Sequence, residues 1–384
     1  MALVSDVDRD RLRTLAEARD SQESVLSLYL NLDPAEFGTP RARRAQADSL
    51  LDDAHRRIEG AERAHEELMA LREALEEARE IVEDLVESAP SARAVAIFVS
   101  RPLELSEVLR LDQPLPSSVA IADEPLIAPL AERGPREDVC AALVTERLAR
   151  FLRGSEHGLR ELLSFGDDVH GRHDQGGWSQ ARYQRSQRED VREHLVHVAR
   201  VLLQTLRSDP YEVLLIACTE PLWSRVIEAL HPDVRARLDE RRLSVDVPDA
   251  SIADIERAVE PLLAERRREH EDELLAELRE RLARPQDGRA AAGLPAVLEA
   301  LVERRVEVLL HDQNAHAAGL RCPRCGWMGL DAERCPVDGG ELEARGEIVE
   351  DAVHVAVAQD ADVVSLRERP ELEALGGVAA TLRF

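Results

Sequence analysis

Residues 171–188 read GRHDQGGWSQARYQRSQR and hold two adjacent glycines, Gly176 and Gly177. Four arginines stand there against a single aspartate, a local charge of +3 in a chain of net charge −26. Paired glycines disfavour a helix or strand interior, so the segment is predicted to be a loop that a ligand can approach closely. With Trp178 and Tyr183, such a basic loop suits a polyanion whose bases stack on aromatic rings. A solvated hairpin with chance arginines is the alternative, and composition does not separate the two.

Length and composition indicate a globular protein of two or three domains. The chain has 384 residues, of which 44% are hydrophobic and 33% charged. It holds no run of 18 apolar residues and does not begin with a basic region before an apolar core, so we expect neither a transmembrane helix nor a secretory signal. Five cysteines, three of them clustered, indicate a reducing compartment and a candidate metal site. A cytoplasmic location is the resulting expectation.

The acidic balance argues against a surface that coats nucleic acid generally, since 76 acidic residues outnumber 50 basic ones. It leaves room for binding through local basic loops. All basic residues are arginine, because the chain has no lysine. This usage is typical of a GC-rich coding bias, so arginine content alone says less about phosphate binding than it usually does.

The first predicted domain, residues 1–133, combines strands with a long helical region. Its expected elements are a short amphipathic helix near 6–20, a buried strand at 24–32, helix from 40 to 88, and strands at 92–99, 103–111 and 118–122. Apolar residues recur at spacings of three and four through the helical region, and Gly60 interrupts it. A helical hairpin on the sheet is favoured over a coiled-coil arm, because so long a single helix needs a partner.

A second α/β domain is predicted for residues 137–284. Its expected elements are strands at 138–145 and from 148, the loop 171–188, a helix at 189–207, a continuous apolar strand at 211–218, helices at 225–230 and 232–241, and a strand at 243–247. A long helix follows, begun by the capping-box pattern Ser251-Ile-Ala-Asp254. This helix is predicted to connect the second domain to the third.

The third predicted domain covers residues 293–384 and follows a polar linker at 286–293. A helix turns into a strand over 293–310, with a helix at 351–357, a strand at 361–366 and a terminal apolar strand in LGGVAATLRF. An insertion at 320–345 carries the clustered cysteines.

That insertion holds two halves of the same form, Cys322-Pro-Arg-Cys325-Gly and Cys335-Pro-Val-Asp338-Gly. Proline and glycine shape a knuckle in which both sulfurs face one ion, and two facing knuckles give tetrahedral zinc. Asp338 stands where a fourth cysteine is usual, so we predict a structural zinc site of Cys322, Cys325, Cys335 and Asp338. His354 or water are alternatives for the fourth ligand, and a decayed ribbon without metal is the alternative to the whole site.

Two isolated cysteines, Cys140 and Cys218, lie in apolar predicted strands and are interpreted as packing residues. A pair of histidines beside the loop, with three nearby aspartates, offers metal ligands in principle, but polar loop residues need no such role. The residues concerned are Asp167, Asp168, His170, His173 and Asp174.

The sequence GGWSQARYQR resembles the GGQ loop of the archaeal and eukaryotic class-one peptide chain release factors. The positions that fit the family pattern are Gly176, Gly177, Ser179, Ala181, Arg182 and Tyr183. Trp178 departs from it, because the family has glutamine there. The helix–strand order and the Gly-Gly-Val-Ala-Ala end of the third domain are similar to the same superfamily, including the Pelota-type rescue factors. The resemblance therefore points to the bacterial branch of this superfamily, in which the loop varies.

The resemblance implies a three-domain α/β fold. It implies an RNase H-like central domain, and a ribosomal-protein-like α/β/α sandwich as the third domain, with the zinc ribbon inserted. Some archaeal release factors carry such a ribbon at the corresponding place. In the family the loop reaches the CCA end of peptidyl-tRNA, and the third domain contacts a translational GTPase. The first domain lacks anything like the lysine-bearing stop-codon motif, so stop-codon reading is not supported.

The implied loop chemistry is ester hydrolysis, with Gly176, Gly177, Trp178 and Gln180 as tentative catalytic positions. The backbone N–H at Trp178 is retained, but the glutamine side chain that places water is not. Gln180 or Gln175 can substitute, or the indole can stack on the terminal adenine. The residues expected to bind RNA are Arg172, Trp178, Arg182, Tyr183, Arg185 and Arg188.

Three functions stay open. A factor that occupies the A site of stalled or idle ribosomes, in rescue or hibernation, is favoured by Trp178 and the absent codon motif. A peptidyl-tRNA hydrolase or tRNA nuclease is favoured by the intact glycines and flanking glutamines. A stress-related binding protein outside translation is favoured by the acidic balance. The expected partners are the ribosome, tRNA or rRNA and a translational GTPase, without a membrane, and the sequence leaves the oligomeric state open.

Overall fold

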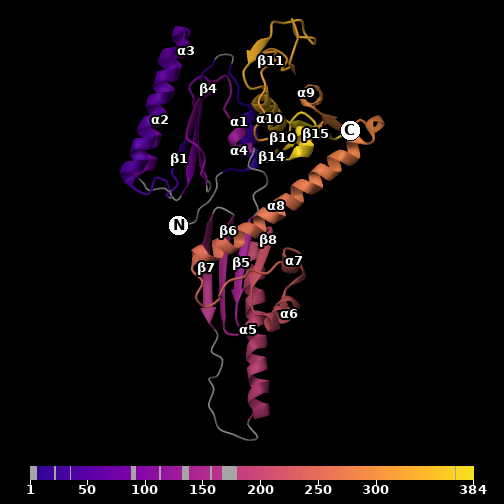
Figure 1. Ribbon diagram of the computed structural model, residues 1–384. Coiled ribbons are helices and arrows are strands. Elements are labelled where there is room, and N and C mark those ends of the chain that lie inside the picture. Colours follow the sequence, from indigo (N-terminus) through magenta and orange to yellow (C-terminus); the bar gives the residue numbers. More distant parts are fainter. Residues whose placement is uncertain are drawn as a thin grey trace. The chain divides into compact units, whose positions relative to one another are not determined.

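The structure is a computed structural model, and it forms two compact units (Figure 1). One unit combines Met1–Gly134 with Glu271–Phe384, and the other is Pro135–His270. The structure describes residues 7–20, 23–34, 36–87, 92–111, 114–131, 138–155, 158–166, 180–367 and 369–384, with side chains undescribed at 180–187. Each unit is described by itself.

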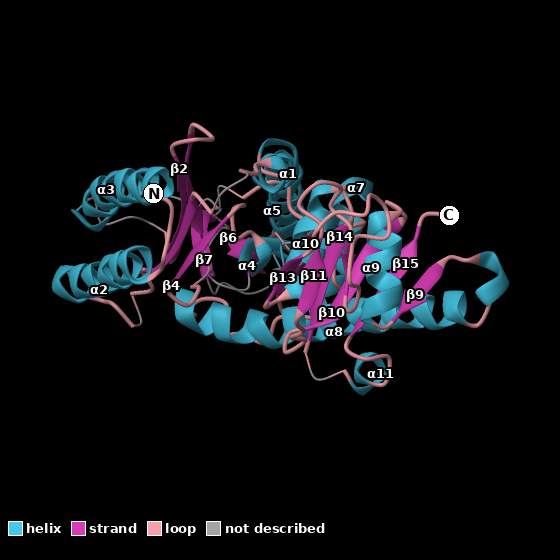
Figure 2. Ribbon diagram, turned by 90° about the horizontal axis from the view of Figure 1, so that it is seen from above, coloured by secondary structure: helices cyan, strands magenta, loops and turns pink. Residues whose placement is uncertain are grey.

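The first unit opens with an antiparallel sheet of order β3-β2-β1-β4. Its strands are β1 (Val25–Asn31), β2 (Ala94–Ser100), β3 (Leu105–Leu111) and β4 (Ser118–Ala122). Helices α2 (Pro40–Gly60) and α3 (His65–Glu87) cover one face (Figure 2). They pack there on alternate residues of β1 such as Leu26 and Leu28. Tyr29 points to the other face, which α1 (Arg9–Glu17) and α4 (Ala128–Ala131) cover. Because both faces are covered, β1 is buried throughout.

The predicted helical hairpin is confirmed, and a single coiled-coil arm is excluded. Helix α2 ends at Gly60, α3 begins at His65, and the two pack on each other and on the sheet. The alternating strand predicted at 24–32 and the three strands that follow the hairpin are confirmed as well.

A second sheet in the same unit has the order β14-β10-β15-β9. Its strands are β9 (Ala290–Ala292), β10 (Val306–Asp312), β14 (Asp362–Leu366) and β15 (Val378–Leu382), and only the β10–β14 pair is parallel. Helices α9 (Leu294–Val302) and α10 (Ile348–Ala358) cover one face. Leu275 and Leu278 of α8 (Ile252–Leu282), with α11 (Pro370–Glu373), cover the other. The result is a three-layer α/β/α arrangement.

The linker predicted at 286–293 is wrong in part. The 3-10 helix Pro285–Asp287 begins it, and β9 then adds an edge strand that pairs with β15. Three alanines carry little strand propensity, so this strand depends on its partner in the sheet rather than on local sequence.

The central unit holds a mixed sheet of order β7-β6-β5-β8. Its strands are β5 (Val139–Val144), β6 (Leu148–Ser155), β7 (Gly158–Gly166) and β8 (Val213–Ala217). Strands β5, β6 and β7 are antiparallel neighbours, and β8 is parallel to β5. Helices α5 (Gln180–Ser208), α6 (Glu220–Ala229) and α7 (Pro232–Arg235) pack on one face, and the first half of α8 packs on the other.

Three sequence expectations for this unit are corrected. Strand β7 was not predicted. The strand predicted at 243–247 is absent from this described segment, where Leu243 donates one backbone hydrogen bond to Ile216 over 3.1 Å and is otherwise irregular beside Pro248. The predicted loop 171–188 is helical from Gln180 onward, because no glycine or proline follows until Pro210 and the run is rich in Gln, Arg and Ala.

The capping box is confirmed. The Asp254 amide lies 3.2 Å from the Ser251 hydroxyl, and the Ser251 amide lies 3.1 Å from the Asp254 carboxylate. Helix α8 begins there and runs without interruption past Pro261. The domain limits 1–133, 137–284 and 293–384 stay a prediction. None of the helices in the described ranges is long and apolar enough to cross a membrane.

Candidate metal centre and loop-bearing sheet edge

A small antiparallel sheet of order β12-β11-β13 carries the cysteine knuckles. Its strands are β11 (Gly319–Arg321), β12 (Met328–Gly329) and β13 (Glu343–Arg345). The first knuckle is the turn between β11 and β12, and the second lies between β12 and β13. Gly319 packs so closely on Ile348 and the Gly329 carbonyl that a Cβ there would lie 2.7 Å from the isoleucine side chain.

The two knuckles have the same backbone geometry. The Gly326 amide donates to the Cys322 carbonyl over 3.0 Å, and the Gly339 amide donates to the Cys335 carbonyl over 2.9 Å. Both glycines have positive φ, 76° and 68°, a conformation that a residue with Cβ rarely adopts. The equivalence of the two halves that the sequence suggested is therefore present in the backbone.

The four predicted ligands lie together, with all their donor atoms within 4.8 Å of one another. The Cys325 and Cys335 sulfurs are 3.4 Å apart, and the Cys322 sulfur lies 3.5 and 3.6 Å from the Asp338 carboxylate oxygens. Tetrahedral zinc places two thiolates about 3.8 Å apart, and a thiolate and a carboxylate oxygen about 3.6 Å apart. The spacing of the four side chains therefore fits a Cys3Asp site for one metal ion.

Hydrogen bonds hold the Asp338 carboxylate in the cluster. The Gly340 amide donates to it over 2.8 Å, and the Arg324 guanidinium lies 3.1 Å from it. The Gly340 amide and Arg324 keep the pKa of Asp338 well below its usual range, although partial burial opposes them. The side chain is therefore ionised at neutral pH, as a ligand must be.

His354, the alternative fourth ligand, is not in this cluster. It lies on α10, and its Nε2 donates to the Ala16 carbonyl over 2.7 Å and lies 3.5 Å from Glu124. Burial lowers its pKa, against the opposing effect of Glu124. The sequence could not reveal this, because Ala16 and Glu124 are brought to α10 by tertiary packing.

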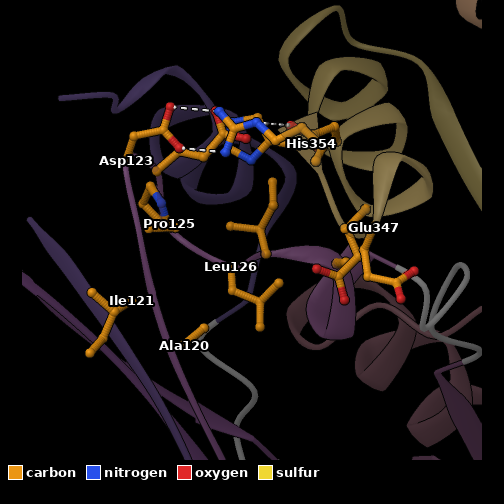
Figure 3. A pocket seen from close by; sticks show the side chains of 15 residues that line it. Ala120, Ile121, Asp123, Pro125, Leu126, Glu347 and His354 are labelled. Atoms are coloured by element: carbon orange, nitrogen blue, oxygen red, sulfur yellow. Dashed lines mark hydrogen bonds and ion pairs between the residues drawn. The ribbon is translucent and has the colours of Figure 1, made fainter. Parts of the chain in front are cut away.

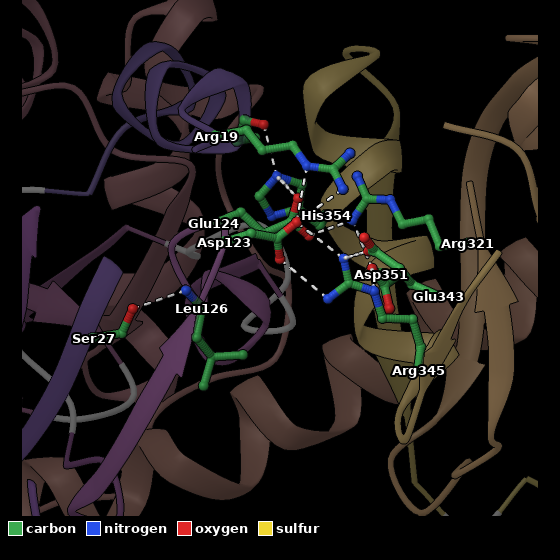
Figure 4. Close-up of polar contacts among 11 residues, drawn as sticks. Arg19, Ser27, Asp123, Glu124, Leu126, Arg321, Glu343, Arg345, Asp351 and His354 are labelled. Atoms are coloured by element: carbon green, nitrogen blue, oxygen red, sulfur yellow. Dashed lines mark hydrogen bonds and ion pairs between the residues drawn. The ribbon is translucent and has the colours of Figure 1, made fainter. Parts of the chain in front are cut away.

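A network of buried charges surrounds His354 (Figure 4). Arg321 bonds Glu124 and Asp351, each over 2.6 Å, and Arg345 bonds both oxygens of Asp123 over 3.0 and 3.1 Å. The network ties the segment after β4 to β11, β13 and α10, all within the first unit. Sequence reasoning missed these residues, since partners some 200 positions apart leave no local signal.

A cavity of about 230 Å³ adjoins this network (Figure 3). Apolar residues of the segment 120–128 line one wall, and its acidic side includes Glu347 and Glu350. Burial and the neighbouring Glu347 raise the pKa of Glu350. The buried carboxylates Asp123, Glu124 and Asp351 are paired with arginines. The network therefore stabilises the packing of the segment after β4 on β11, β13 and α10.

The central loop is held at one edge of the central sheet. The strand register aligns Gly166 with Leu148, and Val144 with Ala149 beside it. Strand β8 is parallel to β5 with Leu143 opposite Ala217, so α6 also begins at this edge. Residues 167–179 connect Gly166 to the start of α5, and the loop's ends are therefore fixed by a strand and a helix.

The loop residues predicted from the sequence lie mostly outside the described residues. These are Arg172, Gly176, Gly177 and Trp178, with the histidine–aspartate group 167–174. Gln180, Arg182, Tyr183 and Arg185 are placed in the first turns of α5 by their backbone alone. Arg188 is described fully, is exposed, and follows them on the same helix. Their roles stay predictions.

The isolated cysteines behave as packing residues. Cys140 is fully buried in the core, and burial raises the pKa of its thiol to about 12. Burial likewise raises the pKa of Cys218 to about 11. Both thiols therefore stay protonated at neutral pH, whereas a nucleophilic cysteine must be a thiolate.

Comparison with known proteins gives one family. The model described as bacterial archaeo-eukaryotic release factor family 10 matches residues 125–262. No curated protein matches the chain.

Several solved structures are similar at low identity. Archaeal aRF1 is 15% identical, with 98% of this chain and 99% of that chain covered and a TM-score of 0.27. Pelota of Archaeoglobus fulgidus is 19% identical over 76% and 79%, with a TM-score of 0.35. A ribosome-bound archaeal Pelota is 16% identical over 99% and 95%, with a TM-score of 0.43. At these TM-scores the similarities carry no argument about this chain.

The described residues define a mixed α/β protein with several sheets and a cysteine cluster that could hold a metal ion. Residues 125–262 match the family model of the bacterial archaeo-eukaryotic release factors, and the resemblance drawn from the sequence is confirmed by this match.

Proposed function

We propose that this protein is a translation factor that binds the ribosome at the A site and acts in rescue or hibernation rather than in stop-codon reading. The family match carries the proposal, because residues 125–262 include the whole segment that bears the glycine loop. Strand β7 ends at Gly166 and helix α5 begins at Gln180, so regular elements anchor both ends of the loop. Such anchoring suits a loop that must reach a distant target.

The domain roles follow the same proposal. The order β7-β6-β5-β8, with three antiparallel strands and one parallel strand, supports an RNase H-like central domain. The layers around β10 support a ribosomal-protein-like third domain whose partner is a translational GTPase. Zinc held by Cys322, Cys325, Cys335 and Asp338 would be structural, since four protein ligands leave no open position for chemistry. The cytoplasm is the proposed location.

Trp178 decides between binding and catalysis. Hydrolysis of peptidyl-tRNA needs an oriented water and a donor to the developing oxyanion. The backbone N–H at Trp178 can supply the donor, but an indole has a single donor and no acceptor with which to orient water. We therefore assign the loop a binding role, in which the indole stacks on a base.

A release enzyme is the second candidate, favoured by the sequence Gly176-Gly177 and by Gln180 at the first position of α5. In this candidate Gln180 orients the water in place of the missing side chain. A tRNA nuclease is a variant of this candidate.

Release of labelled peptide from peptidyl-tRNA on purified ribosomes tests the assignment, with wild type compared to Trp178→Gln. We expect no release by wild type and measurable release by the variant. Release by wild type that is lost in Gln180→Ala would establish the enzyme instead. Failure of the protein to bind ribosomes would favour a role outside translation.

A further inference from the structure

The acidic charge of the chain is divided unequally between the two units. Pro135–His270 contains 21 arginines and 25 acidic residues, a net charge of −4, while the other unit carries −22. The central unit therefore repels a polyanion less strongly than the other unit does.

Several described arginines of the central unit that lie away from the loop are paired with carboxylates, whereas Arg200, Arg207, Arg235 and Arg237 have no ion pair in the described structure. Such pairs are Arg150–Glu161, Arg153–Asp209, Arg241–Asp239, Arg257–Asp254 and Arg266–Asp239. A paired guanidinium must lose its partner before it can bind a phosphate. Three arginines near the loop have no ion pair in the described structure, namely Arg147, Arg188 and Arg225.

These three arginines lie on a turn and two helices that meet the same end of the sheet. Arg147 lies in the turn between β5 and β6, next to Leu148, which pairs with Gly166 at the loop's start. Arg225 lies on α6, which begins at the same edge. Its guanidinium donates to the Arg188 carbonyl over 3.4 Å, so α5 and α6 are in contact at this point.

Two of the acidic residues beside them are neutralised by other arginines. Glu189 bonds Arg192 over 2.7 Å, and Glu220 is paired with Arg242. Arg242 also lies 5.3 Å from the centre of the Trp223 ring, which adds an aromatic face to this edge. Glu146, in the same turn as Arg147, and the exposed Glu193 and Glu228 on α5 and α6 have no ion pair in the described structure and oppose the group.

We propose that Arg147, Arg188 and Arg225 form an RNA-backbone-binding surface that positions the loop. The inference rests on the proposed function and deepens it, because it names residues outside the loop that contact phosphates. Contacts of this kind fix orientation without reading sequence, which suits a loop that must be delivered to one place. The phosphates belong to ribosomal RNA or to tRNA, and the two sources are separable by experiment.

The test measures binding of the full-length protein to ribosomes and, separately, to free tRNA, over a range of salt concentrations. The variants are Arg188→Glu, Arg225→Glu and Arg147→Glu, singly and combined. Arg207→Glu is the matched control, because Arg207 is exposed on the same helix, about 28 Å from Arg188 by helix rise, at the opposite edge. Arg225→Gln replaces Arg225→Glu if thermal melting shows that the latter unfolds.

We expect each reversal at the loop edge to weaken binding about tenfold or more and to reduce the slope of log K against log salt by about 0.7–0.9. Arg207→Glu should leave both unchanged. Loss of ribosome binding alone assigns the surface to ribosomal RNA, and loss of tRNA binding assigns it to tRNA. Wild-type binding with unchanged variants would overturn this inference only. Absence of wild-type binding to either RNA would overturn the proposed function as well.

Discussion

Asp338 changes the chemistry of the predicted zinc site without removing a ligand from it. Its carboxylate takes the place of a fourth thiolate, within 3.6 Å of the Cys322 sulfur. The repeated knuckle spacing predicted this position from sequence, because the pattern is local. The same reasoning left His354 open as a ligand, and only the packing of α10 against Ala16 excluded it.

Replacing Asp338 tests the metal site. We expect one zinc per chain in wild type, a loss of affinity of about tenfold or more in Asp338→Ala, and retention in Asp338→Cys. The exposed Asp331 of the same segment supplies the control Asp331→Ala, which should bind zinc as wild type does. Elemental analysis and a chelator competition provide the readout. Wild-type protein purified without zinc, and unable to take it up, would refute the site.

The burial of His354 makes the free energy of unfolding depend on pH. Burial lowers its pKa, so the unfolded chain binds a proton more readily than the folded one, and stability falls as pH drops below about 6.5. The loss approaches about 1.4 kcal/mol per pH unit. The groups that face the ring are Glu124, Arg321 and Asp351, and Glu124 moderates the effect.

His354→Gln should flatten the pH dependence of the unfolding free energy between pH 5 and 7. His311, whose pKa burial also lowers, keeps part of the slope. The exposed His55 supplies the control His55→Gln. An unchanged slope in His354→Gln would show that this ring is not the sensitive group.

At the scale of elements, strand β7, which leads into the loop, depends on close pairing with β6 at its other end. A Cβ at Gly154 would lie 1.9 Å from the Gly158 carbonyl oxygen of the neighbouring strand. Gly154→Ala should therefore destabilise the central unit by about 1–3 kcal/mol or more, since the backbone must move. Gly60→Ala, where no atom lies within 4 Å, should be neutral or slightly stabilising. Equal melting temperatures for the two variants would contradict the described pairing.

Elements with strong local patterns were predicted well, and those that depend on partners were not. The helix begun by Ser251 and the apolar strand β8 follow directly from capping and hydrophobic runs. Strand β7 mixes polar and apolar residues because it is an edge strand, and β9 is three alanines. The helical start of α5 at Gln180 was not predicted, because the paired glycines just before it led us to extend the loop to residue 188.

On the scale of the whole molecule, the first unit is joined by charges that no local pattern reveals. Arg321 neutralises two buried carboxylates, Glu124 and Asp351, from segments far apart in the chain. Arg321→Ala would leave Glu124 with only His354, 3.5 Å away, and Asp351 with only Arg345, 3.8 Å away. The loss should cost about 3–5 kcal/mol in the unfolding free energy of this unit. Arg72→Ala breaks the solvent-exposed pair with Glu59 and should change the unfolding free energy much less, because solvent screens such a pair. Denaturant unfolding measures both, and a mild effect of Arg321→Ala would mean that the network does not hold the unit together.

Co-sedimentation of the wild-type protein with purified bacterial ribosomes, at low and at physiological salt, tests the central claim most directly. The account predicts that the protein pellets with ribosomes at both salt concentrations, less at the higher one, and stays in solution without them. Protein that remains in the supernatant with ribosomes present, even at low salt, would contradict it.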